Sequence, residues 1–283
     1  MKPINIVICM VVILYMITGA QMAYCEKPKY AFGVTGGYLN AENDAKYIYN
    51  CESCGNAMGS FNKGTTFTGL TFEYLLDYGI ESSIITRLYY NSFSNTYSLS
   101  GESFAHLEES PVPSDPPRIV YVETMYDWEV KYSLITFDVL PKVKIPIINL
   151  GVFAGISISY LAESRYSESW RIVQPLNVRF NYNYQAELAA KGYVYEDDDR
   201  KIRMKEGEIP FKNDIRYGFK AGLQYDFDFW GLQASPFVAI DLPMNDVVNG
   251  VNLDCPPLAC STRKDSHWKI TYYQAGLDFK YIF

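Results

Sequence analysis

The run YQAGLDFKYIF, from Tyr273 to Phe283, constrains the fold of this chain more than any other part of the sequence. Apolar or aromatic residues occupy every second position: Tyr273, Ala275, Leu277, Phe279, Tyr281 and Phe283. The positions between them are small or polar, and only Ile282 breaks the alternation. A period of two predicts a β-strand with one apolar face, which must be covered by a protein core or by lipid.

The beginning of the sequence bears on that choice. A basic Lys2, an apolar stretch from Ile6 to Ile17 and the small residues Thr18-Gly19-Ala20 are typical of a secretory signal peptide. We expect cleavage after Ala20, with Ala23 as the alternative position. The apolar stretch is short for a membrane-spanning helix, which needs about 20 apolar residues. An uncleaved anchor is the second reading of this segment.

The composition favours a barrel over an ordinary soluble enzyme. The chain is 48% hydrophobic and 16% aromatic, with 25 Tyr and 16 Phe, and no stretch after the signal is long and apolar enough for a spanning helix. An exported chain of this kind must cross a membrane with strands if it crosses one at all. We therefore predict an all-β fold, a closed antiparallel transmembrane β-barrel whose strands place apolar side chains outward and polar ones inward.

Eight segments carry the alternation, and each has about the 9–11 residues that a tilted spanning strand needs. They lie near 30–38, 69–76, 80–90, 129–140, 150–160, 218–229, 232–242 and 273–283. We predict that residues 1–20 are the signal peptide and that residues 21–283 form a single eight-stranded, up-and-down barrel. Ten strands are the alternative, because Val178 to Gln185 also alternates.

The fourth segment changes phase. Its apolar residues share one parity at first and the other parity later: Trp128, Val130, Tyr132 and Leu134, then Ile135, Phe137 and Val139. One extra residue in a strand moves every later side chain to the opposite face, so the pattern predicts a β-bulge near Leu134.

The connections between these segments alternate between short and long. The short ones are Asp77-Tyr78, Pro141 to Asn149 and Trp230-Gly231, and the long ones are 40–63, 94–127, 162–210 and 243–267. Bacterial outer-membrane barrels have short periplasmic turns and long extracellular loops. The pattern therefore predicts both termini in the periplasm, four extracellular loops and an even number of strands.

Two segments resemble a known family. FDVLPKVKIPIINLGVFAGISISYL, from Phe137 to Leu161, and DIRYGFKAGLQYDF, from Asp214 to Phe227, resemble the outer-membrane β-barrel domain family that includes PorT-like proteins. The resemblance covers most of the mature chain and implies a small barrel in the bacterial outer membrane, but no particular activity. The terminal Phe279, Tyr281 and Phe283 are similar to the signal read by the barrel-assembly machinery.

Five cysteines remain once Cys9 leaves with the signal. Cys51 and Cys54 lie in the first long connection, and Cys255 and Cys260 lie in the last. An exported chain permits disulfides, which we prefer over a four-thiolate zinc site in an oxidising compartment. Two disulfides, one within each loop, and a cross-loop disulfide such as Cys51–Cys260 are the alternative connectivities. Tyr24 is too bulky for a lipoprotein reading of Cys25, whose role we leave open.

Nothing in the sequence favours an enzyme, a metal or a cofactor. His106 and His267, both assigned to loops, read as surface histidines, and Asp197-Asp198-Asp199 lacks the spaced ligands of a calcium loop. Inward charges could be named a catalytic cluster, but such residues more often pair to fill a narrow lumen. These residues are Glu73, Glu81, Arg87, Lys220, Asp226, Asp278 and Lys280. We expect no catalytic residue, no metal and no cofactor.

Charge and barrel size set the expected partners. Cleavage after Ala20 removes one Lys of the 25 basic residues and none of the 32 acidic ones, which leaves a net charge of −8 and disfavours nucleic acid. We expect contact with outer-membrane lipid, with the assembly machinery, and with an extracellular ligand or envelope partner bound by the loops. The predicted function is a non-enzymatic barrel with an adhesion, docking or envelope-structural role. A narrow porin-like channel is the first alternative, and a lipid-modifying enzyme is the second.

Overall fold

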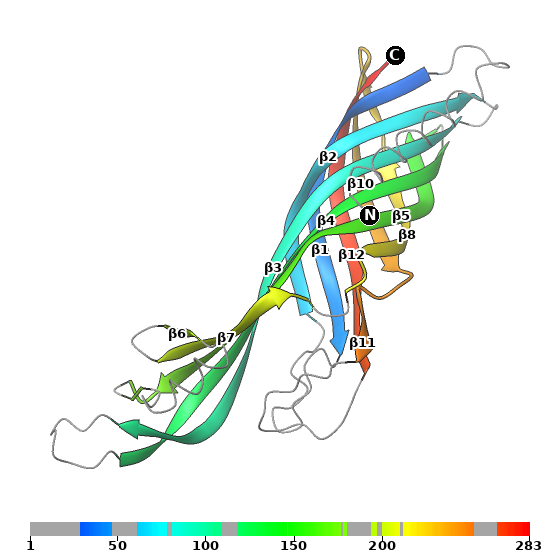
Figure 1. Ribbon diagram of the computed structural model, residues 1–283. Coiled ribbons are helices and arrows are strands. Elements are labelled where there is room, and N and C mark those ends of the chain that lie inside the picture. Colours follow the sequence, from blue (N-terminus) through cyan, green and yellow to red (C-terminus); the bar gives the residue numbers. More distant parts are fainter. Residues whose placement is uncertain are drawn as a thin grey trace.

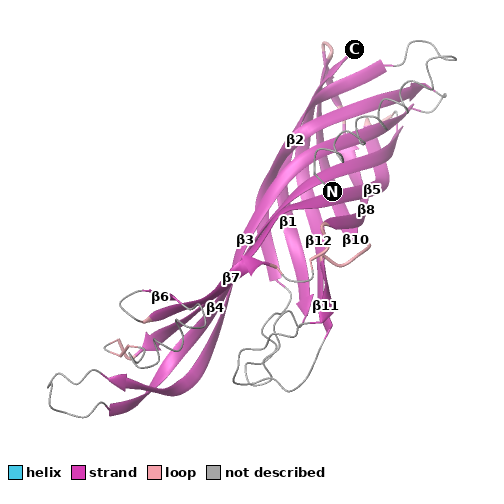
Figure 2. Ribbon diagram, viewed as in Figure 1, coloured by secondary structure: helices cyan, strands magenta, loops and turns pink. Residues whose placement is uncertain are grey.

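The computed structural model is all-β and has the form of a barrel with an arm that projects from one end (Figures 1 and 2). It describes residues 29–46, 61–77, 81–108, 118–145, 147–176, 178–179, 194–196, 200–209, 212–251 and 265–283. The predicted signal peptide, all six cysteines and Asp197-Asp198-Asp199 lie outside these residues. Among the described residues, no helix is long and apolar enough to span a membrane.

Eight strands form the wall of the barrel. They are β1 (Lys29–Lys46), β2 (Phe61–Asp77), β3 (Glu81–Glu108), β4 (Arg118–Ile145), β5 (Leu150–Gln174), β8 (Ile215–Tyr225), β10 (Leu232–Pro243) and β12 (Asp265–Ile282). Each strand pairs antiparallel with the next, and β12 pairs with β1 to close the ring. The predicted eight-stranded, up-and-down barrel is therefore confirmed, while most of the segment on which ten strands depended, Val178 to Gln185, lies outside the described residues.

The arm consists of strands that continue beyond the ring. It contains β3 from Ser92, β4 up to Ser133, β5 from Ala162, and the short strands β6 (Val194–Glu196) and β7 (Lys201–Glu208). The β2–β3 ladder ends at Phe67 and Asn91, and the β5–β8 ladder ends at Tyr160 and Ile215. At these two points the sheet leaves the ring, and it continues as β3-β4-β5-β7-β6 (Figure 1).

The expected strand lengths and loops were wrong on this side of the molecule. Only β8, with 11 residues, has the expected length among the wall strands, and the other seven have 12 to 28. The expected loop 94–127 is largely the continuation of β3 and β4. Much of the loop 162–210 is likewise β5, β6 and β7, and β11 (Val248–Val251) lies in the last one. His106 and His267, assigned to loops, lie in β3 and β12. The strands were predicted from apolar side chains at every second, outward position. The sheet continues here without such a row, so the sequence pattern did not indicate it.

The opposite end of the barrel has short connections, as predicted. Trp230 and Gly231 form a two-residue turn between β9 (Phe227–Phe229) and β10, with φ angles of 45° and 86°. Two positive φ angles define the turn that matches the twist of a tight hairpin, and Gly adopts one of them without strain. Pro141 was expected in a turn but lies inside β4, where it lacks the N–H for a ladder bond and no Pro141 pairing with β5 occurs. The amide of Phe283 donates to the carbonyl of Tyr30 at 2.7 Å, so the two ends of the described chain meet here.

The phase change in the sequence has a different origin from the one predicted. Even-numbered residues of β4 point inward on both sides of Leu134, so this strand keeps its phase. The register shift instead falls on the neighbouring strand, because Ser133 pairs with Glu163 and Leu134 pairs with Leu161, which leaves Ala162 as the extra residue in β5. The buried positions of β5 change from odd to even at this residue.

Candidate functional site

The outer wall of the barrel is the first functional surface. Its side chains are apolar and exposed over all the wall strands, including Phe32, Leu70, Leu88, Val139, Ile156, Leu223, Val238 and Leu277. The predicted alternation of these residues with inward polar ones is confirmed. An exposed apolar band of this extent is the lipid-facing surface of a transmembrane barrel.

Aromatic side chains border the apolar band at both ends. Near the short turns these are Phe72, Tyr74, Phe227, Phe229, Trp230, Tyr281 and Phe283, and near the arm they are Tyr38, Tyr90, Tyr160, Tyr217 and Tyr273. Aromatic girdles of this kind mark the two interfaces of a membrane. Phe279, Tyr281 and Phe283, the predicted assembly signal, lie on the outer face, and the rings of the last two contact each other at a centroid distance of 5.1 Å.

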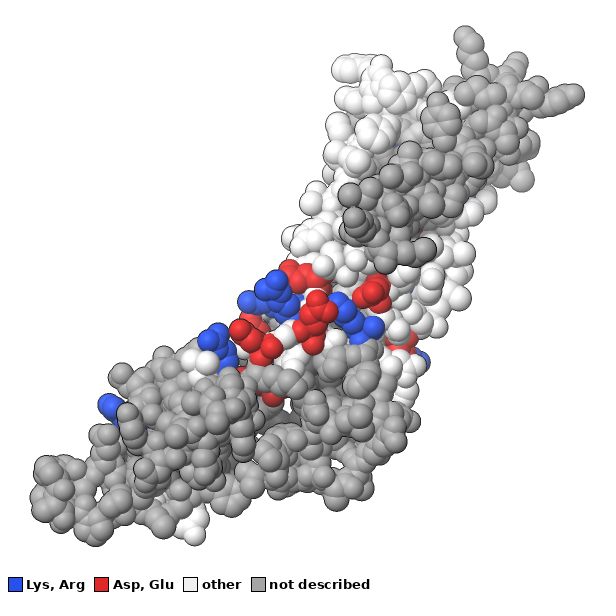
Figure 3. Space-filling model, viewed as in Figure 1, with Lys and Arg blue, Asp and Glu red and all other residues white. Residues whose placement is uncertain are grey.

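A charged belt lies beyond the second girdle, at the junction between barrel and arm. Figure 3 shows these side chains gathered on one face, next to a barrel surface with few charges. The belt comprises Glu129, Lys131, Glu163, Arg165, Glu208, Lys212 and Asp214. Exposed charges cannot face the hydrocarbon cheaply, so the belt marks the end of the membrane-spanning part and places the arm in water.

The lumen is filled by charged side chains that are almost completely buried. Five are basic and five are acidic: Arg87, Lys142, Arg216, Lys220 and Lys280 against Glu73, Asp138, Asp226, Asp241 and Asp278. Of the seven inward charges predicted from the sequence, only Glu81 is absent from this set, because it lies exposed at the rim near Lys144. The equal numbers of opposite charges make the buried set electrically balanced.

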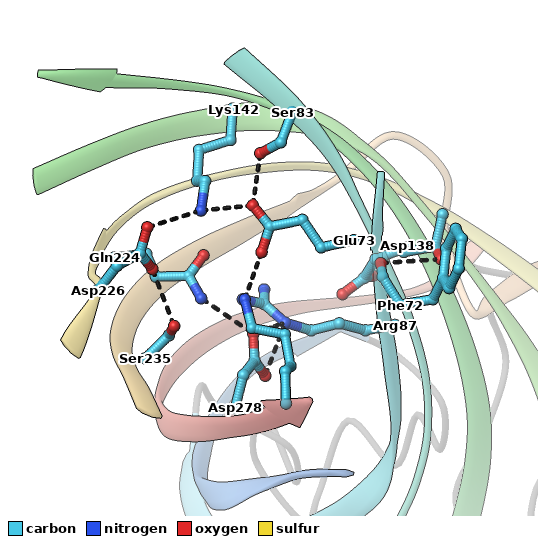
Figure 4. A network of polar contacts seen from close by, with 12 residues as sticks. Phe72, Glu73, Ser83, Arg87, Asp138, Lys142, Gln224, Asp226, Ser235 and Asp278 are labelled. Atoms are coloured by element: carbon cyan, nitrogen blue, oxygen red, sulfur yellow. Dashed lines mark hydrogen bonds and ion pairs between the residues drawn. The ribbon is translucent and has the colours of Figure 1, made fainter. Parts of the chain in front are cut away.

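The layer nearest the short turns is centred on Lys142 (Figure 4). Its ammonium group contacts Glu73 Oε1 at 2.6 Å and Asp226 Oδ2 at 3.0 Å. Glu73 also pairs with Lys280 and accepts a hydrogen bond from Ser83, and Asp226 accepts one from Ser235 at 2.8 Å. Each buried carboxylate therefore has both a cation and a hydroxyl donor, which is the condition under which buried charge is tolerated.

The middle layers use aromatic rings as well as carboxylates. Arg87 pairs with Asp278 at 2.8 Å, and its guanidinium group lies 3.8 Å from the ring centroid of Phe237. Lys220 contacts Asp138 at 2.6 Å and donates to Tyr89 Oη at 3.0 Å. Charge and cation–π contacts thus span the lumen from wall to wall.

Further layers toward the arm complete the filling. Arg216 binds both carboxylate oxygens of Asp241, at 2.9 and 3.2 Å. Beyond it, Tyr132 Oη and Trp268 Nε1 both donate to Asn43 Oδ1, at 3.1 and 3.0 Å. The lumen therefore changes from ion pairs to a packed aromatic layer as it approaches the arm.

Four of the ten lumen charges were missed at the level of sequence. Asp138, Lys142, Arg216 and Asp241 all occupy inward positions, and the period-2 parity of their strands was the signal that could have found them. Lys142 was assigned to a turn after Pro141, and Arg216 lies just before the segment assigned to its strand. The end of the fourth strand was therefore placed too early, and the start of the sixth was placed too late.

The described residues offer no metal site, since no group of three or more His, Cys, Asp or Glu side chains is placed to hold an ion. His267 is exposed and its Nδ1 lies 2.9 Å from Asp246 Oδ2. Lys269 lies 3.8 Å from the other carboxylate oxygen of Asp246. This cluster joins the β10–β11 connection to β12.

Comparison with known proteins finds resemblance in structure only. No known protein family matches the sequence, and no curated protein matches it. Ail, the attachment invasion locus protein of Yersinia pestis, is 9% identical over 89% of this chain and 99% of its own, with a TM-score of 0.35. Neisserial surface protein A is 11% identical over 89% and 98%, with a TM-score of 0.31. The outer membrane protease OmpT from Escherichia coli is 8% identical over 90% and 97%, with a TM-score of 0.32. At these scores the fold assignment rests on the strand pairing of this chain itself.

Proposed function

We propose that this protein is a non-enzymatic barrel of the bacterial outer membrane that acts through its arm in an adhesion, docking or envelope-structural role. The arm is the observation that carries the proposal. Three neighbouring strands of 25 to 28 residues continue past the charged belt, whereas the other five wall strands have 11 to 18. A sheet that is built beyond the membrane has no part in spanning it, so its surface serves another contact.

The filled lumen supports this proposal over the channel alternative. The ten buried charges pair across the barrel, and eight strands leave an interior just wide enough for side chains. The second alternative, a lipid-modifying enzyme, has no specific observation in its favour. His267, Asp246 and Lys269 form a small cluster near the arm end of β12.

Several finer assignments belong to the same proposal. It includes a signal peptide at residues 1–20 and membership of the PorT-like family. It also includes recognition of Phe283 by the assembly machinery, and disulfides among Cys51, Cys54, Cys255 and Cys260. The composition of the N-terminal stretch supports export, and the aromatic girdles support insertion into a membrane.

The orientation can be tested with two lysine variants that are equally exposed at opposite ends. Tyr121 in the arm is 87% exposed, and Ile147 in the β4–β5 turn is 93% exposed. Peptide mapping locates the label, because native lysines such as Lys131 are exposed as well. On intact cells, a membrane-impermeant amine reagent should label position 121 of Tyr121→Lys, and it should label position 147 of Ile147→Lys only after permeabilisation. Labelling of the turn on intact cells would overturn the orientation and with it the proposed role of the arm.

Conductance tests the closed lumen. We expect the refolded barrel in planar bilayers to pass no steady unitary current, because the ion pairs and the aromatic layer fill its cross-section. Large and stable unitary currents from the unmodified chain would favour the channel alternative.

A further inference from the structure

One edge of the arm ends in a strand that has a partner on one side only. From Ser92 to Ser103, β3 pairs with β4, and in the described part of the chain it pairs with no strand on its other side. Only the carbonyl of Ser92 is engaged there among the described residues, by the hydroxyl of Thr65 at 2.7 Å. A free edge presents a row of backbone N–H and C=O groups that can accept a further strand.

The sequence of this edge lacks the usual protection against strand addition. Residues 92–103 read SFSNTYSLSGES, with a single charge at Glu102 and no Lys or Pro. Edge strands that must stay free of partners carry charges, prolines or bulges. The first register shift in the β3–β4 ladder falls after Ser103, so the edge is regular over its whole length up to that point.

A row of carboxylates lies one strand further in. Glu129 pairs in register with Thr96, and Asp127 pairs with Ser98, on the exposed face of the arm. Ser94 donates to Glu129 at 3.3 Å and Ser98 donates to Asp127 at 2.5 Å. Lys131 lies 3.2 Å from Glu129 and Arg171 lies 2.9 Å from Asp127, so a basic side chain on an added strand shares these two carboxylates with them. Only the short side chains of Thr96 and Ser98 separate the two carboxylates from the open edge, so a long basic side chain can reach them.

We propose that the β3 edge of the arm binds an extended segment of a partner protein as an added strand, with Lys or Arg at alternating positions of that segment. The inference rests on the proposed function, since it requires the arm to be outside the membrane. The backbone of the partner pairs with residues 92–103, and its basic side chains lie over Ser and Thr toward Asp127 and Glu129. Main-chain pairing supplies affinity and alternate side chains supply selectivity in binding of this kind.

Synthetic peptides test the proposal on the full refolded protein. The probe is a peptide in which Lys and Val alternate, and its control has Glu in place of every Lys. We expect the Lys peptide to bind and to slow amide hydrogen exchange in residues 92–103, and the Glu peptide to bind at least about tenfold more weakly. No binding of the Lys peptide, or equal binding of both, would overturn the proposal.

Paired variants compare charge added at the edge with charge added elsewhere on the arm. The double variant Ser94→Lys, Ser98→Lys places two charges on the edge and should abolish binding of the Lys peptide. Tyr121→Lys adds one charge to β4 of the same arm and should leave most of that binding. In the free protein, β4 already protects the alternate amides of residues 92–103 that point toward it. Protection of the remaining amides, which point away from β4, would show the edge already covered by its own chain or a second copy, which also overturns the proposal. All these outcomes leave bilayer conductance and surface labelling unchanged, so they are distinguishable from failure of the proposed function.

Discussion

The barrel and the arm share three strands, β3, β4 and β5, yet they use the two faces of those strands in opposite ways. In the barrel half of β4, inward Asp138 is polar and outward Val139 is apolar. In the arm half, Val130 is buried and Lys131 is exposed. In β4 the parity of the buried face is the same throughout, and only the chemistry changes. The environment of the outer face, lipid around the barrel and water around the arm, therefore decides which face carries the apolar side chains.

The largest difference between the two regions should appear when one charge of an ion pair is removed. Lys220→Met leaves Asp138 buried without a cation and removes a donor to Tyr89, and breaking a buried pair in this way costs about 3–5 kcal/mol. Unfolding by denaturant in lipid or detergent measures this loss. The double variant Lys220→Met, Asp138→Leu should recover most of it, and a single variant within about 1 kcal/mol of the parent would contradict the account of the lumen.

A charge on the outer wall should have the next largest effect. Leu223→Arg places a cation in the apolar band, at a cost of about 2–4 kcal/mol near the midplane of a bilayer. Tyr121→Arg makes the same change on the arm and should cost little. Folding yield into lipid vesicles compares the two variants. Gln224 is no neutral control, because its side chain is buried and donates to Asp278.

The barrel could be predicted from the sequence to a much greater extent than the arm. The alternation identified the barrel, the strand count and most of the lumen charges, because lipid outside and ion pairs inside impose opposite chemistry at every second residue. It did not reveal the arm, where both faces contact water or a small core. It also placed the bulge on β4, although the extra residue is Ala162 of β5, since a change of environment and a change of phase look alike in one strand.

Substitution of Phe283 distinguishes the stability of the barrel wall from assembly of the barrel in cells. Phe283→Ala removes an exposed aromatic at the margin of the band, worth at most about 1–3 kcal/mol, so refolding in vitro should be only mildly affected. Assembly in cells should suffer more, with precursor accumulating in the periplasm. Ile282→Ala on the inward side should have little effect in either assay. Normal assembly of Phe283→Ala in cells, or equal failure in both assays, would make this residue ordinary wall.

The smallest effect should come from an ion pair on the arm. Arg171 Nε lies 2.9 Å from Asp127 Oδ2, but the Arg side chain is half exposed. Asp127→Asn should therefore change the free energy of unfolding by less than about 1 kcal/mol. A loss as large as that of Lys220→Met would mean that the arm is as dry as the lumen, and the contrast between the two regions would fail.

Closure of the ring has a consequence for the order of folding. β3, β4 and β5 are neighbours in sequence as well as in the sheet, whereas closure joins Ala31 to Ile282. Contacts between residues so far apart form slowly, because a long loop of chain must be confined first. The β3–β4–β5 sheet can therefore pair while β1 and β12 are still two open edges. During that interval the chain is exposed to aggregation, and a chaperone that shields β1 until β12 arrives would shorten the hazard.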